Sequence, residues 1–351
     1  MFLSAALPAG LLVSASDVLE DVSAFRQCSS SSDMILFATE LDAKVAKDHG
    51  VFVMDQGRLK SVLQKPSLAL MNNVEAILPN GNVLSDCFFW MSWKICEQLE
   101  MLWKVRGPCT VETCCYGDFM RPLGYNPLLD YLEEGNSELS SWRKAFADIF
   151  SRVSPEIVNL GPDSFFHMGT AKEFQEHSQR GSRFSTKFLQ SFSNNVCCTL
   201  INCSIGNGSL MEYCKLEDAQ IGSGCLLSGC ESSKPFSLDD NSILFTLCIT
   251  NDEYKYVTIL LHRDDDVKAE KQTLCWMSKE TNLKGISLWN ARLFPVERSR
   301  EASLHATLNF ARGEEDVTIN ELISIGEAVV TSDTQEMIDF RRRLKHEHLV
   351  D

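Results

Sequence analysis

Three patterns that mark common classes of protein are missing from this sequence. It contains no C-x-x-C pair, no H-x-x-x-H or H-E-x-x-H motif, and no basic run longer than Arg341–Arg343. Without the first two patterns there is little support for a dedicated zinc site. A formal net charge of -15 and a pI near 5.0 would repel a phosphate backbone, so we expect no nucleic-acid partner.

Charge is also missing from the first sixteen residues, and no Lys or Arg occurs before Arg26. A secretory signal peptide would carry a basic start, and Pro8 and Gly10 interrupt the apolar run. The segment is too short to span a membrane. We interpret residues 10–14 as a buried strand that leads to a polar loop at Asp17, and we expect a cytoplasmic protein with no membrane partner.

The fourteen cysteines do not form the pattern of a disulfide framework. They are spread over 351 residues and include two adjacent pairs, at 114–115 and 197–198. Disulfide-rich secreted domains are usually short, so we interpret these cysteines as reduced, mostly buried thiols. The chain is 44% hydrophobic and 23% charged, which is typical of an ordinary folded protein.

Residues 1–190 alternate short β-rich runs with helical stretches, which predicts an α/β layer structure. This pattern favours a central sheet covered by helices. The clearest strands are residues 34–38, 51–54 and 109–115, and the clearest helices are residues 92–105 and 137–153.

A segment of different character covers residues 191–232. Ile205-Gly206-Asn207-Gly208 recurs as Ile221-Gly222-Ser223-Gly224, and apolar residues return every five or six positions. This spacing is typical of a hexapeptide-repeat β-helix, here of about two coils, in which Gly residues turn the corners. Two hairpins with Gly turns are the alternative.

Residues 233–351 return to strand-like runs and end in a charged helical stretch. The strands are expected at residues 242–250 and 256–261, and the helical tail at residues 319–346. The pattern predicts a mixed β/α C-terminal domain.

Asp17 is the first candidate for a functional residue. It follows the carboxyl end of the strand predicted at residues 10–14, where α/β sheets present side chains to ligands. The alternative is that Asp17 caps a helix at residues 18–25.

Two further motifs carry chemically suitable residues. Lys65 precedes Pro66, which holds the loop extended, and its ammonium group suits a sugar phosphate. Tyr116-Gly117-Asp118 follows the strand predicted at 109–115; Gly permits close backbone approach, and Asp can accept a hydrogen bond from a sugar or bind a metal. A solvated loop lysine and a tight Gly-Asp turn are the alternatives.

Seven segments match, in order, the landmarks of a known family. They are residues 48–53, Lys65-Pro66-Ser67, Tyr116-Gly117-Asp118-Phe119, residues 165–170, the β-helix segment, residues 286–295 and residues 322–325. On these segments the chain resembles the fucose-1-phosphate guanylyltransferases, or GDP-L-fucose pyrophosphorylases. The matches extend over nearly the whole chain.

The resemblance implies a fold and a reaction. The fold is a Rossmann-like nucleotidyltransferase domain at 1–190 that is incomplete at its N-terminus, a short left-handed β-helix at 191–232, and a β-rich C-terminal domain with terminal helices at 233–351. The reaction transfers GMP from GTP to β-L-fucose 1-phosphate and releases pyrophosphate. Positioning and charge neutralisation by cations, including Mg²⁺ bound transiently with GTP, should dominate catalysis.

The resemblance also assigns roles to residues. It makes Asp17 the leading metal ligand, Lys65 the leading sugar-phosphate contact, and Asp118 a second carboxylate for the metal or for fucose. These three are the expected catalytic residues. The expected substrate-binding residues are His49, Lys65, Tyr116, Gly117, Asp118, His167, Gly169 and Thr170.

Two departures from the family pattern leave an alternative open. Complete members begin with a strand and a Gly-rich loop bearing Arg and Lys, which cradles the triphosphate, and no such loop precedes Asp17. Cys114 stands where we expect a carboxylate, and a thiol binds Mg²⁺ poorly. The alternative is a catalytically silent relative that binds sugar nucleotides or partner subunits. An oligomer could form through the β-helix or the C-terminal domain.

Overall fold

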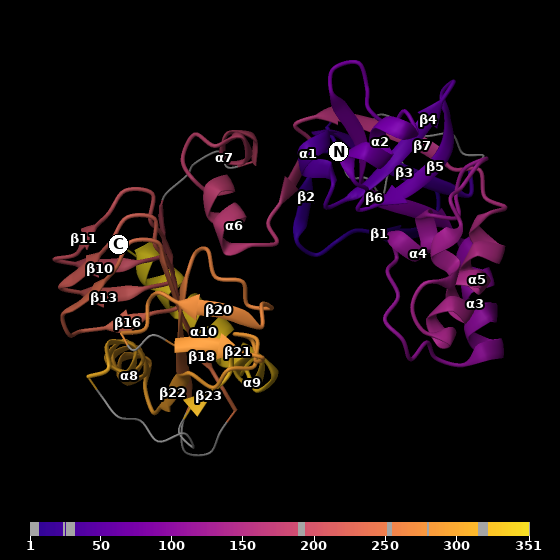
Figure 1. The fold of residues 1–351 in the computed structure, drawn as a ribbon. Coiled ribbons are helices and arrows are strands. Elements are labelled where there is room, and N and C mark those ends of the chain that lie inside the picture. Colours follow the sequence, from indigo (N-terminus) through magenta and orange to yellow (C-terminus); the bar gives the residue numbers. More distant parts are fainter. Residues whose placement is uncertain are drawn as a thin grey trace. The chain divides into compact units, whose positions relative to one another are not determined.

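The computed structural model describes residues 7–23, 25, 32–188, 194–250, 255–278, 281–314 and 322–350. The chain divides into two compact units, Met1–Gly169 and Thr170–Asp351, which are described separately below (Figure 1). The domain boundary predicted at residue 190 lies outside the described residues.

The first unit is built on a six-stranded sheet. Its strands are β1 (Gly10–Val13), β3 (Met34–Asp42), β4 (Gly50–Asp55), β5 (Arg58–Gln64), β6 (Asn82–Ser92) and β7 (Glu156–Pro162). The order is β5-β4-β6-β3-β7, with β1 also paired to β6. Only β3 and β7 run parallel; the other pairs between these strands are antiparallel.

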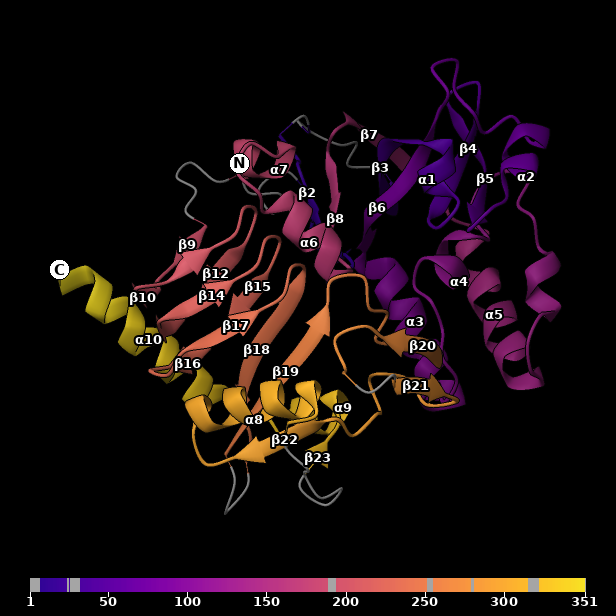
Figure 2. The same ribbon diagram turned by 60° about the vertical axis from the view of Figure 1, so that its left-hand side comes forward.

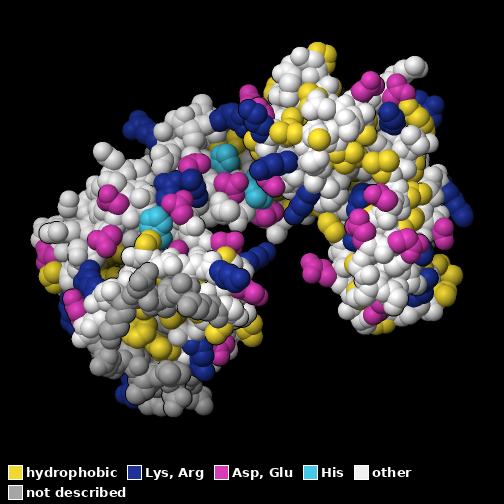
Figure 3. Space-filling view, in the orientation of Figure 1, with side chains coloured by type: hydrophobic (Ala, Val, Ile, Leu, Met, Phe, Trp, Pro, Cys, Tyr) yellow, Lys and Arg dark blue, Asp and Glu magenta, His cyan; other side chains and the backbone are white. Residues whose placement is uncertain are grey.

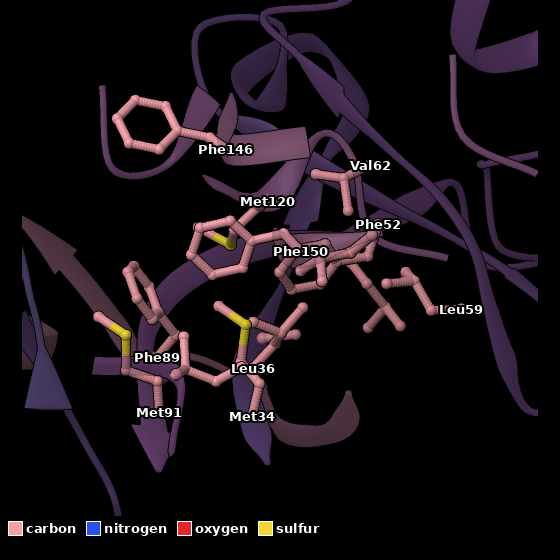
Figure 4. Close-up of a cluster of buried hydrophobic side chains, with 14 of the residues drawn as sticks. Met34, Leu36, Phe52, Leu59, Val62, Phe89, Met91, Met120, Phe146 and Phe150 are labelled. Atoms are coloured by element: carbon pink, nitrogen blue, oxygen red, sulfur yellow. The ribbon is translucent and has the colours of Figure 1, made fainter. Parts of the chain in front are cut away.

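Alternation along the central strands explains why the sheet has an apolar core on each face. Met34, Leu36 and Ala38 of β3 belong to one cluster, whereas Ile35 and Phe37 belong to the other. In Figure 4, Leu36 and Phe89 lie in the first cluster together with Phe146 and Phe150 of α5 (Ser137–Phe150). The amphipathic helix predicted at 137–153 therefore exists, and it begins at the N-cap Asn136.

The remaining elements of the first unit are short, apart from one helix. A two-stranded ribbon joins β2 (Val18–Glu20) to β8 (Phe165–His167). The other helices are α1 (Ala43–Ala46), α2 (Leu68–Asn73), α3 (Trp93–Arg106), α4 (Gly117–Met120) and the 3-10 turn η2 (Asp130–Glu133).

Three local expectations are wrong. The segment 109–115 is a loop, because no strand lies beside it among the described residues and the Asp118 carboxylate binds the Cys114 N–H. Residues 18–20 pair with β8 as a strand instead of starting a helix. The strand at 10–13 is present but not buried: Leu11 is 44% exposed, because β1 pairs only with β6 within the described ranges.

The second unit contains a three-sided β-solenoid of three turns (Figure 2). One side carries β9 (Asn195–Val196), β12 (Leu210–Glu212) and β15 (Leu226–Ser228); the second β10 (Thr199–Ile201), β13 (Lys215–Glu217) and β16 (Glu231–Ser232); the third β11 (Ser204–Ile205), β14 (Ala219–Ile221) and β17 (Phe236–Leu238). The two copies of the predicted repeat lie in register, with Ile205 opposite Ile221. A solenoid is confirmed, with one turn more than the two expected.

The solenoid continues directly into the C-terminal part of the unit. Here β15 pairs with β18 (Ser242–Cys248), which is followed in the same sheet by β19 (Tyr256–His262), β22 (Phe294–Glu297) and β23 (Leu322–Ile323). The other elements are α6 (Ala171–His177), α7 (Arg183–Phe188), β20 (Lys271–Leu274), β21 (Thr281–Lys284), α8 (Arg300–Arg312), α9 (Ile325–Val330) and α10 (Thr334–Val350).

A buried arginine joins α10 to this sheet. The Arg300 guanidinium donates to the Gly229 carbonyl at 2.9 Å and to Glu336 at 2.8 Å, and it lies 3.8 Å from the centre of the Phe340 ring. The charge is therefore fully partnered where it is buried, as a stable interior requires.

The described helices and surface charges were compared with what a membrane span or a charged binding face would require. Among its helices, none has the length and apolar composition that a membrane span requires. On the face shown in Figure 3, Lys and Arg side chains are interspersed with Asp and Glu.

Candidate functional site

Asp17 and His167 are brought together by the β2/β8 ribbon. Val18 pairs with His167, and the Asp17 carbonyl accepts a hydrogen bond from the Met168 N–H at 2.7 Å. As a result, Asp17 Oδ2 lies 3.5 Å from His167 Nε2, and both side chains are partly exposed. The pair can present a carboxylate and an imidazole to a ligand.

Gly169 gives this pair its close approach to the backbone. A Cβ at position 169 would lie 2.6 Å from the His167 ring and 2.9 Å from Asp17 Oδ2. Both distances are too short for a side chain to be accommodated without displacing the pair. Here the glycine is required by space, not by its backbone angles.

His49 and Lys65 lie at neighbouring strand ends. Residue 49 immediately precedes β4, residue 65 immediately follows β5, and the Lys65 N–H donates to the His49 carbonyl at 3.0 Å. The His49 ring packs edge-to-face on the His167 ring, with centroids 5.6 Å apart. Asp17, His167, His49 and Lys65 therefore belong to one edge of the first unit.

Lys65 is the cation of this group. Its side chain is exposed and has no ion-pair partner among the described residues, and its backbone adopts a left-handed conformation with φ of 46°. An unpaired ammonium group at a strand end is available to a phosphate.

A buried carboxylate supports the start of β4. Asp86 Oδ1 accepts a hydrogen bond from the Gly50 N–H at 2.8 Å, and a Cβ on Gly50 would meet Asp86 Oδ2 at 2.4 Å. Burial raises the pKa of Asp86 to about 6. Asp86 was not predicted as a site residue, although a lone carboxylate inside the apolar run 83–91 could have indicated it.

Tyr116 ties the Asp17 loop to the sheet. Its hydroxyl donates to the Cys87 carbonyl at 2.7 Å and accepts from the Ala15 N–H at 3.0 Å. Burial, with the nearby Asp86 carboxylate, raises the pKa of the Tyr116 phenol. The hydroxyl thus donates one hydrogen bond and accepts another within the protein, and it holds the loop against the sheet.

Glu20 lies beneath the same loop and was also missed. Burial raises its pKa to about 7, opposed by a hydrogen bond from the Ser14 side chain. Its Oε1 is buried and has no hydrogen-bond partner in the part of the chain that the structure describes. Gln64 Oε1, next to Lys65, shares this property, and the Gln64 side chain packs against Gly117.

Asp118 is occupied by internal contacts. Its two oxygens accept from Arg143 Nε and from the Cys114 N–H, each at 2.8 Å, and the side chain is buried. The Arg143 guanidinium also donates to the Tyr131 and Glu134 carbonyls, which fixes α5 to the loop. None of the contacts described for Asp118 involves Asp17.

Thr170 is the N-cap of α6 and belongs to the second unit. Its hydroxyl accepts from the Glu173 N–H at 3.1 Å, and the Glu173 carboxylate accepts from the Thr170 N–H, which completes a capping box. The structure therefore gives Thr170 a structural role.

Mg²⁺ prefers oxygen ligands and usually keeps several waters or substrate phosphates. Within the described ranges no three His, Cys, Asp or Glu side chains converge as a metal site. Asp17 offers a half-exposed carboxylate beside His167, which fits a cation that takes its other ligands from substrate and water.

Comparisons with known proteins give the family and its limits. The sequence model described as the fucose pyrophosphorylase domain matches residues 1–299. The chain is 25% identical over 385 aligned positions to fucose-1-phosphate guanylyltransferases of Homo sapiens and Mus musculus, covering 86% of this chain. It spans less than two thirds of the length of these relatives, 63% and 65% respectively.

One solved structure is similar in part. It is titled as a mannose-1-phosphate geranyltransferase from Thermus thermophilus and aligns with 72% of this chain and 65% of its own, at 12% identity. The TM-score is 0.31, so this likeness carries no argument about fold or function.

Proposed function

The chain belongs to the fucose pyrophosphorylase domain family, and from this premise we propose that it transfers GMP from GTP to β-L-fucose 1-phosphate. The products are GDP-L-fucose and pyrophosphate. The names of the human and mouse relatives support this reaction.

The observation that carries the proposal is the single edge shared by Asp17, His167, His49 and Lys65. A phosphate oxygen of the sugar phosphate would attack the α-phosphorus of GTP in line, and pyrophosphate would leave. Such chemistry asks the protein mainly to position the groups and neutralise charge. The edge offers both functions within one unit.

We assign a role in the reaction to each residue of this edge. Lys65 binds the phosphate of fucose 1-phosphate and reduces its repulsion from the triphosphate. Mg²⁺, held by Asp17 with substrate oxygens, would supply charge neutralisation on the phosphates. His49 and His167 orient the sugar side, and Gly169 leaves room for them.

The test is release of pyrophosphate from GTP, Mg²⁺ and fucose 1-phosphate, with binding of fucose 1-phosphate and GDP-fucose measured separately by calorimetry. Turnover supports the proposal. Binding without turnover supports the alternative, a silent sugar-nucleotide-binding or subunit-interaction protein. If the chain neither binds these ligands nor releases pyrophosphate, the proposal is wrong.

Lys65→Ala tests the assigned phosphate contact. A charge-assisted hydrogen bond contributes about 1.5–3 kcal/mol, so we expect the KM or Kd for fucose 1-phosphate to rise about 10- to 100-fold, and that for GTP to change less. Lys104→Ala, an exposed lysine of α3 in a surface ion pair, is the matched control and should leave both unchanged. Equal effects of Lys65→Ala on the two substrates would contradict the role.

A further inference from the structure

Strand β6 carries a carboxylate within a stretch that contains no other charge. Residues 83–91 are apolar apart from Ser85 and Asp86, and the Asp86 side chain is buried. A buried carboxylate is costly unless its oxygens are hydrogen-bonded, so its place in the middle of the sheet requires a partner. The partner that the structure gives it is a backbone group of β4.

The Asp86 side chain holds the first residue of β4. The β4–β6 ladder pairs Val51 with Ser85, and one position nearer the start of β4 the Gly50 N–H donates to Asp86 Oδ1 at 2.8 Å. Ser85 Oγ donates to the Gly50 carbonyl at 2.9 Å. A Cβ at position 50 would lie 2.7 Å from Asp86 Cγ, so the carboxylate packs directly on the backbone. The N–H and the carbonyl of Gly50 are therefore both held by side chains of β6.

Gly50 connects this carboxylate to two residues of the candidate site. On the side of β5, Gly50 pairs with Gln64, and the carbonyl of the preceding residue, His49, accepts a hydrogen bond from the Lys65 N–H at 3.0 Å. The hydrogen bond made by Asp86 and the one made by Lys65 are thus on adjacent residues of the chain. A displacement of Gly50 would move the His49 carbonyl, and Lys65 with it.

Lys65 has a backbone conformation that a lysine does not favour by itself. Its φ of 46° lies in the left-handed region, which is disfavoured for a residue with a Cβ, and the following Pro66 restricts it further. Such conformations persist only where the surrounding structure fixes them, and they are concentrated at functional sites. The hydrogen bond to the His49 carbonyl fixes the Lys65 N–H, so the direction in which the Lys65 side chain leaves the sheet depends on it.

We propose that Asp86 is a positioning residue for phosphate binding: it holds Gly50 and, through the His49 carbonyl, fixes the backbone of Lys65 so that the ammonium group meets the sugar phosphate. A carboxylate suits this role because it binds an N–H more strongly than a neutral acceptor does. Asp86 is buried and acts through the backbone of β4. The inference rests on the proposed function, since that function assigns the phosphate contact to Lys65.

Amide hydrogen exchange at Lys65 tests this link without any ligand. Asp86→Leu and Asp86→Ala both remove the acceptor, the first with little change of volume, whereas Asp86→Asn keeps an oxygen that can accept from the Gly50 N–H. We expect exchange at the Lys65 amide to become about 10-fold faster in the first two variants and to change by less than about 3-fold in Asp86→Asn. Leu36→Ala, which removes a buried side chain from the same sheet, is the matched control and should leave exchange at Lys65 unchanged.

The affinity for fucose 1-phosphate tests whether the link matters for binding. Asp86→Leu should raise the Kd or KM for fucose 1-phosphate about 10-fold and that for GTP less, and in a Lys65→Ala background it should have little further effect, because the lysine it positions is gone. Additive effects of the two substitutions, or unchanged exchange at Lys65 in Asp86→Leu and Asp86→Ala, would overturn the positioning role alone. An unaltered chain that does not bind fucose 1-phosphate would contradict the proposed function and, with it, the role of Asp86 in phosphate binding.

Discussion

The hydroxyl oxygen of Tyr116 connects the loop that carries Asp17 to strand β6. Its hydroxyl links the Ala15 N–H, in the loop that carries Asp17, to the Cys87 carbonyl of β6. Its ring packs edge-to-face on Phe89, with centroids 5.8 Å apart. Tyr116 therefore anchors the loop of the residue that is expected to hold a cation, while its predicted contact with substrate stays a prediction.

Tyr116→Phe keeps the ring and removes the anchor. Two neutral hydrogen bonds of about 1 kcal/mol each are lost, so we expect kcat/KM, or the affinity for substrate where turnover is absent, to fall about 10-fold. The Mg²⁺ concentration for half-maximal activity should rise, because Asp17 is less well placed. The control is Tyr125→Phe, since Tyr125 is half exposed and its hydroxyl bonds to Asp55. Equal losses in both variants would exclude a positioning role.

Glu20 makes the stability of the first unit depend on pH. Its pKa is about 7 in the folded chain, against an ordinary value of 4.5, because burial disfavours the charged form. Between these two values the unfolded chain is already deprotonated while the folded chain holds the proton. The free energy of unfolding therefore falls as pH rises from about 4.5 to about 7, and does not fall further from this cause.

Glu20→Gln should remove this contribution. Allowing for partial solvent exposure, we expect the variant to gain about 2 kcal/mol over the unaltered chain at pH 8 and to gain nothing at pH 4.5. Urea unfolding at the two pH values measures the difference. Asp86, whose raised pKa gives a slope of the same sign up to about pH 6, remains in both proteins and cancels in the comparison. A gain of equal size at both pH values would point to packing instead of titration.

For single residues, the sequence predicted the exposed members of the candidate site better than the buried carboxylates near it. Asp17, Lys65 and His167 stand next to predicted strand ends or within recognisable segments, and the structure brings them to one edge. Asp86 lies inside the apolar strand β6, where periodicity alone predicts packing, and Glu20 ends the short strand β2 beside Asp21. Their importance depends on which strand lies beside them, and this is a tertiary property.

At the scale of elements, local pattern predicted those segments whose own sequence determines their partners. The strand at 34–42 begins with a continuous apolar run that is buried on both faces of the sheet, and the helix at 137–150 buries one apolar face in the core. The Ile-Gly repeats predicted a solenoid because every turn repeats the same contact, Ile205 on Ile221 and Ile221 on Leu238. The third turn was missed because Phe236-Ser237-Leu238 lacks the Gly-x-Gly corner.

Segment 109–115 shows the opposite case. Its Thr, Val and Cys residues favour a strand, but a strand needs a neighbour to satisfy its backbone. The described backbone here is held by side chains instead: Cys114 by Asp118, and Asp118 in turn by Arg143 of α5. A buried ion pair that fixes a loop cannot be inferred from the loop's own residues.

At the scale of the whole molecule, the apolar clusters divide between the two units. Every described cluster lies either within Met1–Gly169 or within Thr170–Asp351. Leu36 and Leu227 are fully buried members of the first and second sets, respectively. Since each core consists of residues from one unit, each unit has the means to unfold as its own cooperative structure.

Leu36→Ala and Leu227→Ala test this division with the same chemical change. Loss of a buried Leu costs about 2–5 kcal/mol, and in units of 150–250 residues this lowers a midpoint by about 5–15 °C. In differential scanning calorimetry we expect two transitions, with each variant lowering a different one and leaving the other in place. A single transition lowered alike by both variants would mean that the two cores unfold together, and the chain would then be one cooperative structure despite its two sets of apolar contacts.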